Sequence, residues 1–424
     1  MTPLPRHLLP LTSEVSSTGR LALGGVDLLS LVEEHGTPLF VYDEEHLRRY
    51  CRDAVAAFGD GVAYASKAFL CKAMAALAHE EGMCIDVSTG GELHVALTAG
   101  VPGHRLVLHG NNKSEEELAR ALDAGVDRIV VDSFDEIDRL ERLVAAGRPP
   151  PRVLVRVTPG IEAHTHEYVM TGQEDSKFGF SQASGAAAAA ADRLASSSAA
   201  ELVGVHAHIG SQIFLLSSFV KAVDVLAPFF ASLGLPELCI GGGLGVAYVE
   251  GEDAPTIAAW AETVKTACAD AGIPAGTRIT AEPGRAIVAS AAVTLYRVGT
   301  MKQLPGIRTF VSVDGGMSDN PRPVLYGSGY EAFLPRATDA ERTLVATVVG
   351  KHCESGDVVV RDACLPFDLA VGDVVATPVT GAYGHSMASN YNKVPRPPVV
   401  FVSDGRSRVV VRRETLDDLL RLDE

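Results

Sequence analysis

The hydrophobic and polar positions follow one repeating pattern from residue 62 onward. A short apolar run of the β type is followed by a polar or glycine-rich break, and then by a segment with apolar residues at helical spacing. Eight such runs occur, at residues 62–65, 84–87, 106–108, 129–131, 153–157, 203–207, 238–240 and 278–281. Near-continuous apolar strands with intervening helices indicate a parallel sheet covered by helices, closed most simply as a (β/α)8, TIM-like barrel. An open, doubly wound sheet is the alternative, because spacing alone does not prove closure.

The segments between these runs predict helices. Amphipathic spacing is clearest at residues 114–124, 134–146 and 216–233. Ser114 and Glu117 predict a capping box at the start of the first of these. The alanine-rich residues 185–200 predict a surface helix, since alanine is the strongest helix former.

The pattern changes after Pro283. Strand-like segments follow one another with Gly, Pro and Asp turns between them, at residues 293–298, 309–313, 343–348, 357–360, 374–377, 399–402 and 408–411. No strong helix is expected before residues 414–420. This pattern predicts a second, all-β domain, a C-terminal β-sandwich or β-barrel. We place the barrel at residues 37–283 and the β-domain at residues 1–36 and 284–424; residues 21–23 are expected to join the β-domain and residues 39–42 to lead into the barrel.

Composition and charge narrow the class of protein. The 424 residues include 37 Lys and Arg against 53 Asp and Glu, a formal net charge of −16. Such an acidic chain lacks the basic footprint that nucleic-acid binding needs. No apolar stretch approaches the roughly 20 residues of a membrane span, and the N-terminus has no signal-peptide pattern. The 7 scattered cysteines lack a CxxC pair and fit reduced thiols. We therefore expect a cytoplasmic protein that binds neither membrane nor nucleic acid.

Polar or glycine residues follow every predicted strand of the barrel. The positions are Lys67, Asp86, His109, Asp132, Arg156, His208, residues 241–243 and Glu282. Barrel enzymes gather their active-site groups at these C-terminal strand ends, so the whole set favours an active site more than any one member does. Lys67 by itself is compatible with a solvated surface lysine or with a lysine that forms a Schiff base in a sheltered pocket.

Two glycine-rich turns follow the last two predicted strands, at residues 241–245 and 282–285. Glycines let backbone N–H groups approach an anion, and barrels often bind phosphate in these two loops. The alternative is a pair of tight turns. The GxGxxG spacing of a dinucleotide site is not met.

Histidines and one cysteine are further candidates for chemistry. His206 with His208, and His164 with His166, have the spacing of metal ligands, but no further Cys or His cluster completes a coordination shell, so we expect no metal site. Cys353 lies in a polar stretch, which suits a reactive thiol or proton donor better than a buried apolar role.

Taken together, these motifs resemble those of the diaminopimelate decarboxylases, within the alanine-racemase-like, fold type III group of pyridoxal-phosphate enzymes. The motifs occur in order at residues 64–68 (YASKA), 208–212 (HIGSQ), 241–243 (GGG), 282–285 (EPGR), 314–317 (DGGM), 321–323 (PRP), 353–357 (CESGD) and 381–383 (GAY). The resemblance covers the chain from about residue 36 onward. Phe69 departs from the Asn that many relatives have after the Lys-Ala pair, which could alter packing behind the cofactor.

The resemblance implies a function and a cofactor site. It implies decarboxylation of meso-2,6-diaminopimelate to L-lysine with pyridoxal 5'-phosphate, through an external aldimine and a quinonoid. Lys67 would form the Schiff base, His208 would stack on the ring, and Glu282 would pair with the pyridine nitrogen. The residues implied to bind the cofactor are Lys67, Asp86, His208, Ser211, Gly243, Glu282, Gly284, Arg285 and Tyr383.

The resemblance also implies a substrate site and a homodimer with shared active sites. Cys353 would protonate Cα from the other subunit, and Glu354 would bind the distal ammonium. The substrate-binding residues would be Arg285, Arg322, Tyr326, Glu354 and Tyr383, because a guanidinium suits a carboxylate. Alternatives are a related decarboxylase acting on another diamino acid or a biosynthetic intermediate, and a pyridoxal-phosphate-binding regulator without turnover. A racemase would leave the decarboxylase motifs unexplained.

Overall fold

The computed structural model describes residues 3–161 and 175–424, which form two compact units. One unit, the barrel unit, comprises Tyr50–Gly245 and Ala254–Ala286. The other, the β-domain, comprises Met1–Arg49, Val246–Asp253 and Ile287–Glu424. Within the described residues, no helix is long and apolar enough to cross a membrane.

The barrel unit is built on eight parallel strands. In sheet order they run from β5 (Ala63–Ala65) through β6 (Cys84–Val87), β7 (Leu106–Leu108), β8 (Arg128–Val131), β9 (Arg152–Thr158), β11 (Glu201–His206) and β12 (Glu237–Cys239) to β13 (Arg278–Thr280). The short strand β10 (Phe180–Ser181) pairs with β9. Ala63 N donates to Ala281 O at 3.0 Å and Ala65 N to Pro283 O at 3.2 Å, so the first strand joins the last. These bonds confirm the closed barrel over the open sheet.

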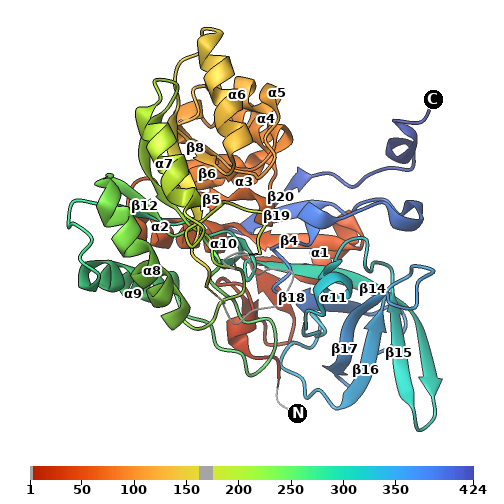
Figure 1. Ribbon diagram of the computed structural model, residues 1–424. Coiled ribbons are helices and arrows are strands. Elements are labelled where there is room, and N and C mark those ends of the chain that lie inside the picture. Colours follow the sequence, from red (N-terminus) through yellow and green to blue (C-terminus); the bar gives the residue numbers. More distant parts are fainter. Residues whose placement is uncertain (1–2, 162–174) are drawn as a thin grey trace. The chain divides into compact units, whose positions relative to one another are not determined.

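Helices separate the strands of the barrel, as the sequence pattern predicts (Figure 1). They are α3 (Lys72–Glu80), α4 (Gly90–Thr98), α5 (Glu115–Asp123), α6 (Phe134–Ala145), α7 (Ala186–Ser196), α8 (Ser217–Leu233) and α9 (Ile257–Asp270), while α2 (Glu44–Phe58) precedes β5 and α10 (Arg285–Val288) follows β13. The capping box at α5 is confirmed: Glu117 N donates to Ser114 Oγ at 3.1 Å, and Ser114 N donates to the Glu117 carboxylate at 3.0 Å. The alanine-rich helix is confirmed as α7.

The inside of the barrel changes from apolar to charged along its axis. A buried layer contains Ala63, Cys84, Val107, Val130, Leu154, Val203 and Cys239. At the N-terminal strand ends, the Glu237 carboxylate pairs with both Arg128 and Arg278, and Arg128 Nε also lies 2.9 Å from Asp127. Arg128 is only 2% exposed. This network closes the end of the barrel opposite to the C-terminal strand ends.

The β-domain contains a mixed sheet with strands from both ends of the chain. Its order is β17 (Val358–Leu365), β16 (Leu344–Val349), β15 (Arg308–Val313), β14 (Ala292–Leu304), β4 (Leu39–Asp43), β19 (Val399–Ser403) and β20 (Arg406–Val411), with β18 (Val374–Pro378) also paired to β14. Strand β14 is long enough to pair with β4 and β18 through its first half and with β15 through its second.

Two local predictions need correction in the β-domain. Residues 39–42 do not lead into the barrel: they form β4, which is antiparallel to β14 and parallel to β19. Residues 21–23 lie in the β-domain, as expected, where they form β2 in a separate three-stranded sheet with β1 (Glu14–Val15) and β3 (Val26–Asp27), followed by α1 (Leu28–His35). Instead of a helix at residues 414–420, only a 3-10 helix at Asp417–Leu420 forms, and the short helix α11 (Arg322–Tyr326) interrupts the strands.

Candidate active site

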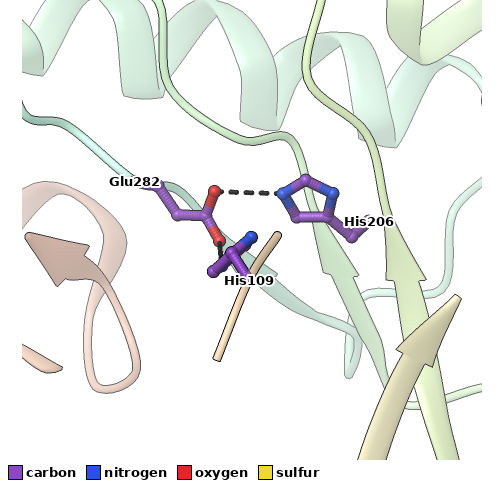
Figure 2. Close-up of side chains that lie close together, drawn as sticks. All are labelled: His109, His206 and Glu282. Carbon is purple, nitrogen blue, oxygen red and sulfur yellow. Dashed lines mark hydrogen bonds and ion pairs between the residues drawn. The ribbon is translucent and has the colours of Figure 1, made fainter. Parts of the chain in front are cut away.

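A carboxylate contacted by two histidines lies at the C-terminal strand ends of the barrel (Figure 2). Glu282 follows β13, His109 follows β7, and His206 is the last residue of β11. The Oε1 atom of Glu282 lies 2.9 Å from His109 Nε2, and its Oε2 atom lies 3.0 Å from His206 Nε2. All three side chains are buried, with 7%, 6% and 1% of Glu282, His109 and His206 exposed. Parallel strands end at the same edge, so residues far apart in sequence meet there.

Electrostatics keep this carboxylate ionised. Burial by itself would raise the pKa of Glu282, but His109 and His206 lower it well below its usual range. A second carboxylate, Asp86 at β6, lies 3.7 Å from the same His109 nitrogen. Burial raises the pKa of Asp86 to about 6, and the charge of Glu282 adds to this effect. Opposite shifts in neighbouring buried carboxylates are typical of functional sites.

Lys67 lies in a 3-10 turn, Ser66–Ala68, directly after β5. Its side chain is exposed, whereas Ser66 and Ala68 on either side are buried. The turn is held by Tyr64, whose hydroxyl donates to the carbonyl of the buried Phe69 at 2.6 Å. The positive charge of Lys67 counteracts the effect of burial, which raises the pKa of Asp86. The lysine therefore acts electrostatically on the carboxylate cluster at the same end of the barrel.

Close backbone contacts shape the two glycine-rich turns. A Cβ atom at Gly243, where φ is +111°, would overlap the carbonyl oxygen of Gly210. A Cβ at Gly284 would lie 2.9 Å from the Ala65 carbonyl oxygen. Arg285 Nη2 donates to Ser211 Oγ at 3.0 Å, so a guanidinium and a hydroxyl adjoin these turns. The combination is suited to a phosphate, because it offers a cation, a hydroxyl donor and glycine backbone that an anion can approach closely.

His208 has a different environment from His206. Gly242 N donates to His208 Nδ1 at 3.1 Å, which fixes the orientation of a half-buried ring. Burial lowers the pKa of His208 well below its usual value, and the charge of Lys67 acts in the same direction. His208 is therefore a neutral ring beside the glycine-rich turn. His206 contacts Glu282, whereas His208 accepts a hydrogen bond from the backbone of Gly242.

The structure brings together a possible set of metal donors that the sequence did not identify. One donor atom each from His109, His206 and Glu282 lies within 4.8 Å of the others. Each histidine nitrogen also approaches one carboxylate oxygen directly, at 2.9 Å for His109 and 3.0 Å for His206. His164 and His166 lie outside the described residues, and the absence of a metal stays a prediction.

Charged pairs that the sequence did not assign to a function also surround this end of the barrel. Arg156 Nη1 lies 3.3 Å from Asp132 Oδ2, and its guanidinium carbon lies 4.4 Å from the centre of the Phe178 ring. The buried Lys113 Nζ lies 2.7 Å from Glu136 Oε1. Asp132 and Arg156 were identifiable as strand-end residues, but nothing in their spacing indicated that they pair.

The β-domain holds the predicted substrate arginine in an aromatic setting. Arg322, at the start of α11, is buried, and its Nη1 donates to Tyr330 Oη at 2.5 Å. Its guanidinium carbon lies 4.2 Å from the centre of the Tyr248 ring. Tyr326, the last residue of α11, is half-buried. Arg322 is therefore a fixed guanidinium rather than the surface charge that its flanking prolines could also have suggested.

The predicted acid and the ammonium ligand lie next to each other on one loop of the β-domain. Cys353 and Glu354 are exposed. Asp357 anchors the loop by accepting hydrogen bonds from His352 N at 2.9 Å and Met317 N at 2.7 Å. Cys353 N donates to Asn392 Oδ1 at 3.1 Å. Tyr383, also half-buried, has a φ of +59°.

Comparisons with known proteins agree with this arrangement. Residues 44–289 match the family model described as "Pyridoxal-dependent decarboxylase, pyridoxal binding domain". The chain is 46% identical to the diaminopimelate decarboxylase of Mycobacterium tuberculosis, over 99% of this chain and 98% of that protein. It is 44% identical to that of Bacillus subtilis, over 97% of each.

Two solved structures extend the similarity to three dimensions. The diaminopimelate decarboxylase from M. jannaschii in complex with L-lysine superposes with a TM-score of 0.91 at 31% identity, over 98% of both chains. The enzyme from Helicobacter pylori, also with L-lysine, gives a TM-score of 0.86 at 32% identity, over 93% of this chain and 98% of that one.

Proposed function

Because the chain belongs to the diaminopimelate decarboxylases, a family of pyridoxal-dependent decarboxylases, we propose that it converts meso-2,6-diaminopimelate to L-lysine and CO2. The observation that carries this proposal is the buried, ionised Glu282 at the same barrel end as Lys67 and the glycine-rich turns. Similarity over nearly the whole chain supports the same activity rather than a shared barrel alone.

The residues of the barrel unit fit pyridoxal 5'-phosphate. A phosphate would be bound by the hydroxyl of Ser211, the closely packed backbone at Gly243 and Gly284, and the guanidinium of Arg285. Glu282 offers an ionised carboxylate to a protonated ring nitrogen, with Asp86 nearby. When bound, the cofactor supplies an electron sink for the electron pair left on Cα by departing CO2.

Two further barrel residues complete the proposed cofactor site. Lys67 follows β5 at the same barrel end as Glu282, and its amine would form the Schiff base. His208 presents a neutral, oriented ring for stacking, because its Nδ1 already accepts a hydrogen bond. Tyr383 of the β-domain is proposed as a further cofactor and substrate contact.

The β-domain residues supply the groups that a substrate with two amino acid heads requires. We assign the distal carboxylate to Arg322 with Tyr326; Arg285 of the barrel unit is a further substrate contact. The carboxylate of Glu354 binds the distal ammonium, and the Cys353 thiol donates the proton that Cα needs after CO2 has left. The exposure of both residues on an anchored loop supports these roles.

We further propose a homodimer in which Cys353 and Glu354 of each chain serve the barrel of the other. An exposed thiol and carboxylate on adjacent positions are free to meet a second copy. In a two-fold dimer both active sites are then completed at once, because each chain gives and receives the same loop.

The test is CO2 release by purified protein with pyridoxal phosphate, using diaminopimelate, lysine, ornithine and arginine as separate substrates. We expect release from diaminopimelate with L-lysine as the product. Arg322→Ala should chiefly raise KM for diaminopimelate, while Arg142→Ala, which removes an exposed guanidinium of the barrel unit, should leave KM unchanged. Release from another amino acid alone would overturn the substrate, and no release from any of the four would overturn the decarboxylase.

A further inference from the structure

Both oxygens of the Glu282 carboxylate are held by histidines that the proposed chemistry does not use. His109 and His206 come from β7 and β11, and their ring centres lie 5.1 Å apart at an angle of 66° (Figure 2). The thiol of Cys239 donates to Oε1 of the same carboxylate, with a distance of 3.4 Å between sulfur and oxygen. A carboxylate contacted on both oxygens has a fixed plane and cannot rotate freely.

The surroundings of His206 make it a neutral hydrogen-bond donor. Its Nε2 faces Glu282, whereas its Nδ1 has no hydrogen-bond partner among the described residues. The proton must therefore lie on Nε2, because only that nitrogen has an acceptor to receive it. Burial lowers the pKa of His206 to about 4, and the charges of His109 and Arg156 also disfavour a second proton.

The surroundings of His109 favour the cation. Its Nε2 lies 2.9 Å from Glu282 and 3.7 Å from Asp86, so one nitrogen faces two carboxylates. Burial and Arg156 oppose a charge, but Asp86 and Glu282 outweigh them and raise the pKa of His109 above its ordinary value. Lys67 and Glu92 also act on Asp86, with opposite signs. A buried pair of carboxylates would otherwise force one of them to take up a proton.

We propose that His109 and His206 are positioning residues that keep Glu282 ionised and correctly oriented toward the ring nitrogen of the cofactor. The positive charge of His109 keeps Glu282 ionised, and the neutral N–H of His206 fixes the orientation of its carboxylate. This inference rests on the proposed function, because it assigns the pyridoxal-phosphate ring to Glu282. It predicts that the two histidines, although they contact the same carboxylate, tolerate different substitutions.

Glutamine separates the two roles, since it keeps a neutral N–H donor but cannot carry a charge. The affinity of His206→Gln for pyridoxal phosphate should lie within about threefold of the wild-type value. The affinity of His206→Phe should fall by more than this. His109→Gln should bind it about 10- to 100-fold more weakly, the effect expected for losing a buried charge-assisted interaction. His46→Gln is the matched control, because His46 is also buried and neutral but lies in the β-domain, and its affinity should equal that of the wild type.

The visible absorption of bound cofactor gives a readout that a merely structural role would not move. In His109→Gln a less ionised Glu282 leaves the ring nitrogen unprotonated, which removes a positive charge near the Lys67 nitrogen. The pKa of the Schiff base that Lys67 forms with the cofactor, read from the absorption, should therefore rise by about one unit or more in His109→Gln. It should stay unchanged in His206→Gln. Decarboxylation by His109→Gln should show a lower kcat with little change in KM.

A measurement without cofactor keeps the inference testable if a phenylalanine variant fails to fold. Nitrogen-15 chemical shifts of the histidine side chains distinguish the cation from each neutral tautomer. At neutral pH we expect a cationic His109 and a neutral His206 protonated on Nε2. A neutral His109, or wild-type cofactor affinity and absorption in His109→Gln, would overturn the role of charge. Equal losses in His206→Gln and His206→Phe would overturn the neutral donor. A wild-type protein that does not bind pyridoxal phosphate would instead overturn the proposed function.

Discussion

The buried ion-pair network at the N-terminal end of the barrel predicts that Glu237→Gln strongly destabilises the barrel unit. The substitution preserves the shape of the side chain and removes its charge. Arg128, which is only 2% exposed, then keeps its own charge without its main partner, and water cannot replace the lost carboxylate. Thr280 Oγ1 also donates to the Glu237 carboxylate, at 3.3 Å.

The magnitude follows from what remains around Arg128. Breaking a buried pair by removing one partner costs about 3–5 kcal/mol, because a buried charge is left uncompensated. Asp127 still lies 2.9 Å from Arg128 Nε and offsets part of this loss. Arg278 is partly exposed and can be solvated. We therefore expect the free energy of unfolding to fall by about 2–4 kcal/mol.

Guanidinium unfolding followed by tryptophan fluorescence measures this loss directly. The chain has 1 tryptophan, and Trp260 is buried in the barrel unit against Phe58 and Phe219. The control is Glu115→Gln, which breaks an exposed pair with Arg142 and should change the free energy of unfolding by less than about 0.5 kcal/mol. A loss below about 1 kcal/mol in Glu237→Gln would refute the reasoning, since the network would then behave like a surface pair.

Three other predictions concern the cofactor turn, the dimer and a buried acid. Gly243→Ala should weaken pyridoxal-phosphate binding, measured by equilibrium dialysis, because its Cβ would overlap the Gly210 carbonyl; unchanged affinity would contradict this. Mixing the inactive variants Lys67→Ala and Cys353→Ala should restore about a quarter of wild-type activity if the sites are shared, and none if each chain is self-sufficient. Burial raises the pKa of Asp319 from 3.8 to about 7, so folding takes up a proton and stability falls as pH rises through this interval. In Asp319→Asn the free energy of unfolding should fall less steeply between these pH values. An unchanged slope would exclude this acid as the source of the pH dependence.

The strands of the barrel were predictable because each is an apolar run with a clear break after it. All eight runs lie within about two residues of the observed strands. The same signal failed for β4, whose five residues are all buried. An apolar run indicates a buried strand but not the sheet that it joins, and β4 finds its partners near Ala292 and Val399, which no local pattern reveals.

The position of the site was predictable from the sequence, but the contacts between its side chains were not. Glu282 and His109 could be located because they follow strands, where barrel enzymes place their chemistry. His206 and His208 have the spacing of metal ligands on one strand, which requires that their side chains point the same way. However, β11 ends at His206, so the pleat does not extend to His208, and the two rings bind Glu282 and Gly242 instead. The contact between His206 and Glu282 depends on how the barrel closes, and this information is not local.

The pairing of β4 with β14 has a consequence for how the chain is synthesised. Strand β4 leaves the ribosome about 250 residues before β14, its antiparallel partner. At about 5–20 residues per second, the five residues of β4 wait about 12–50 s for that partner, while the whole barrel is being translated. During this interval the strand is a nascent segment without its native neighbours, and its unpaired backbone can join strands of other chains. A circular permutant that begins after β4 and carries it at the C-terminus would shorten this delay, so β4 would meet a sheet that has already formed.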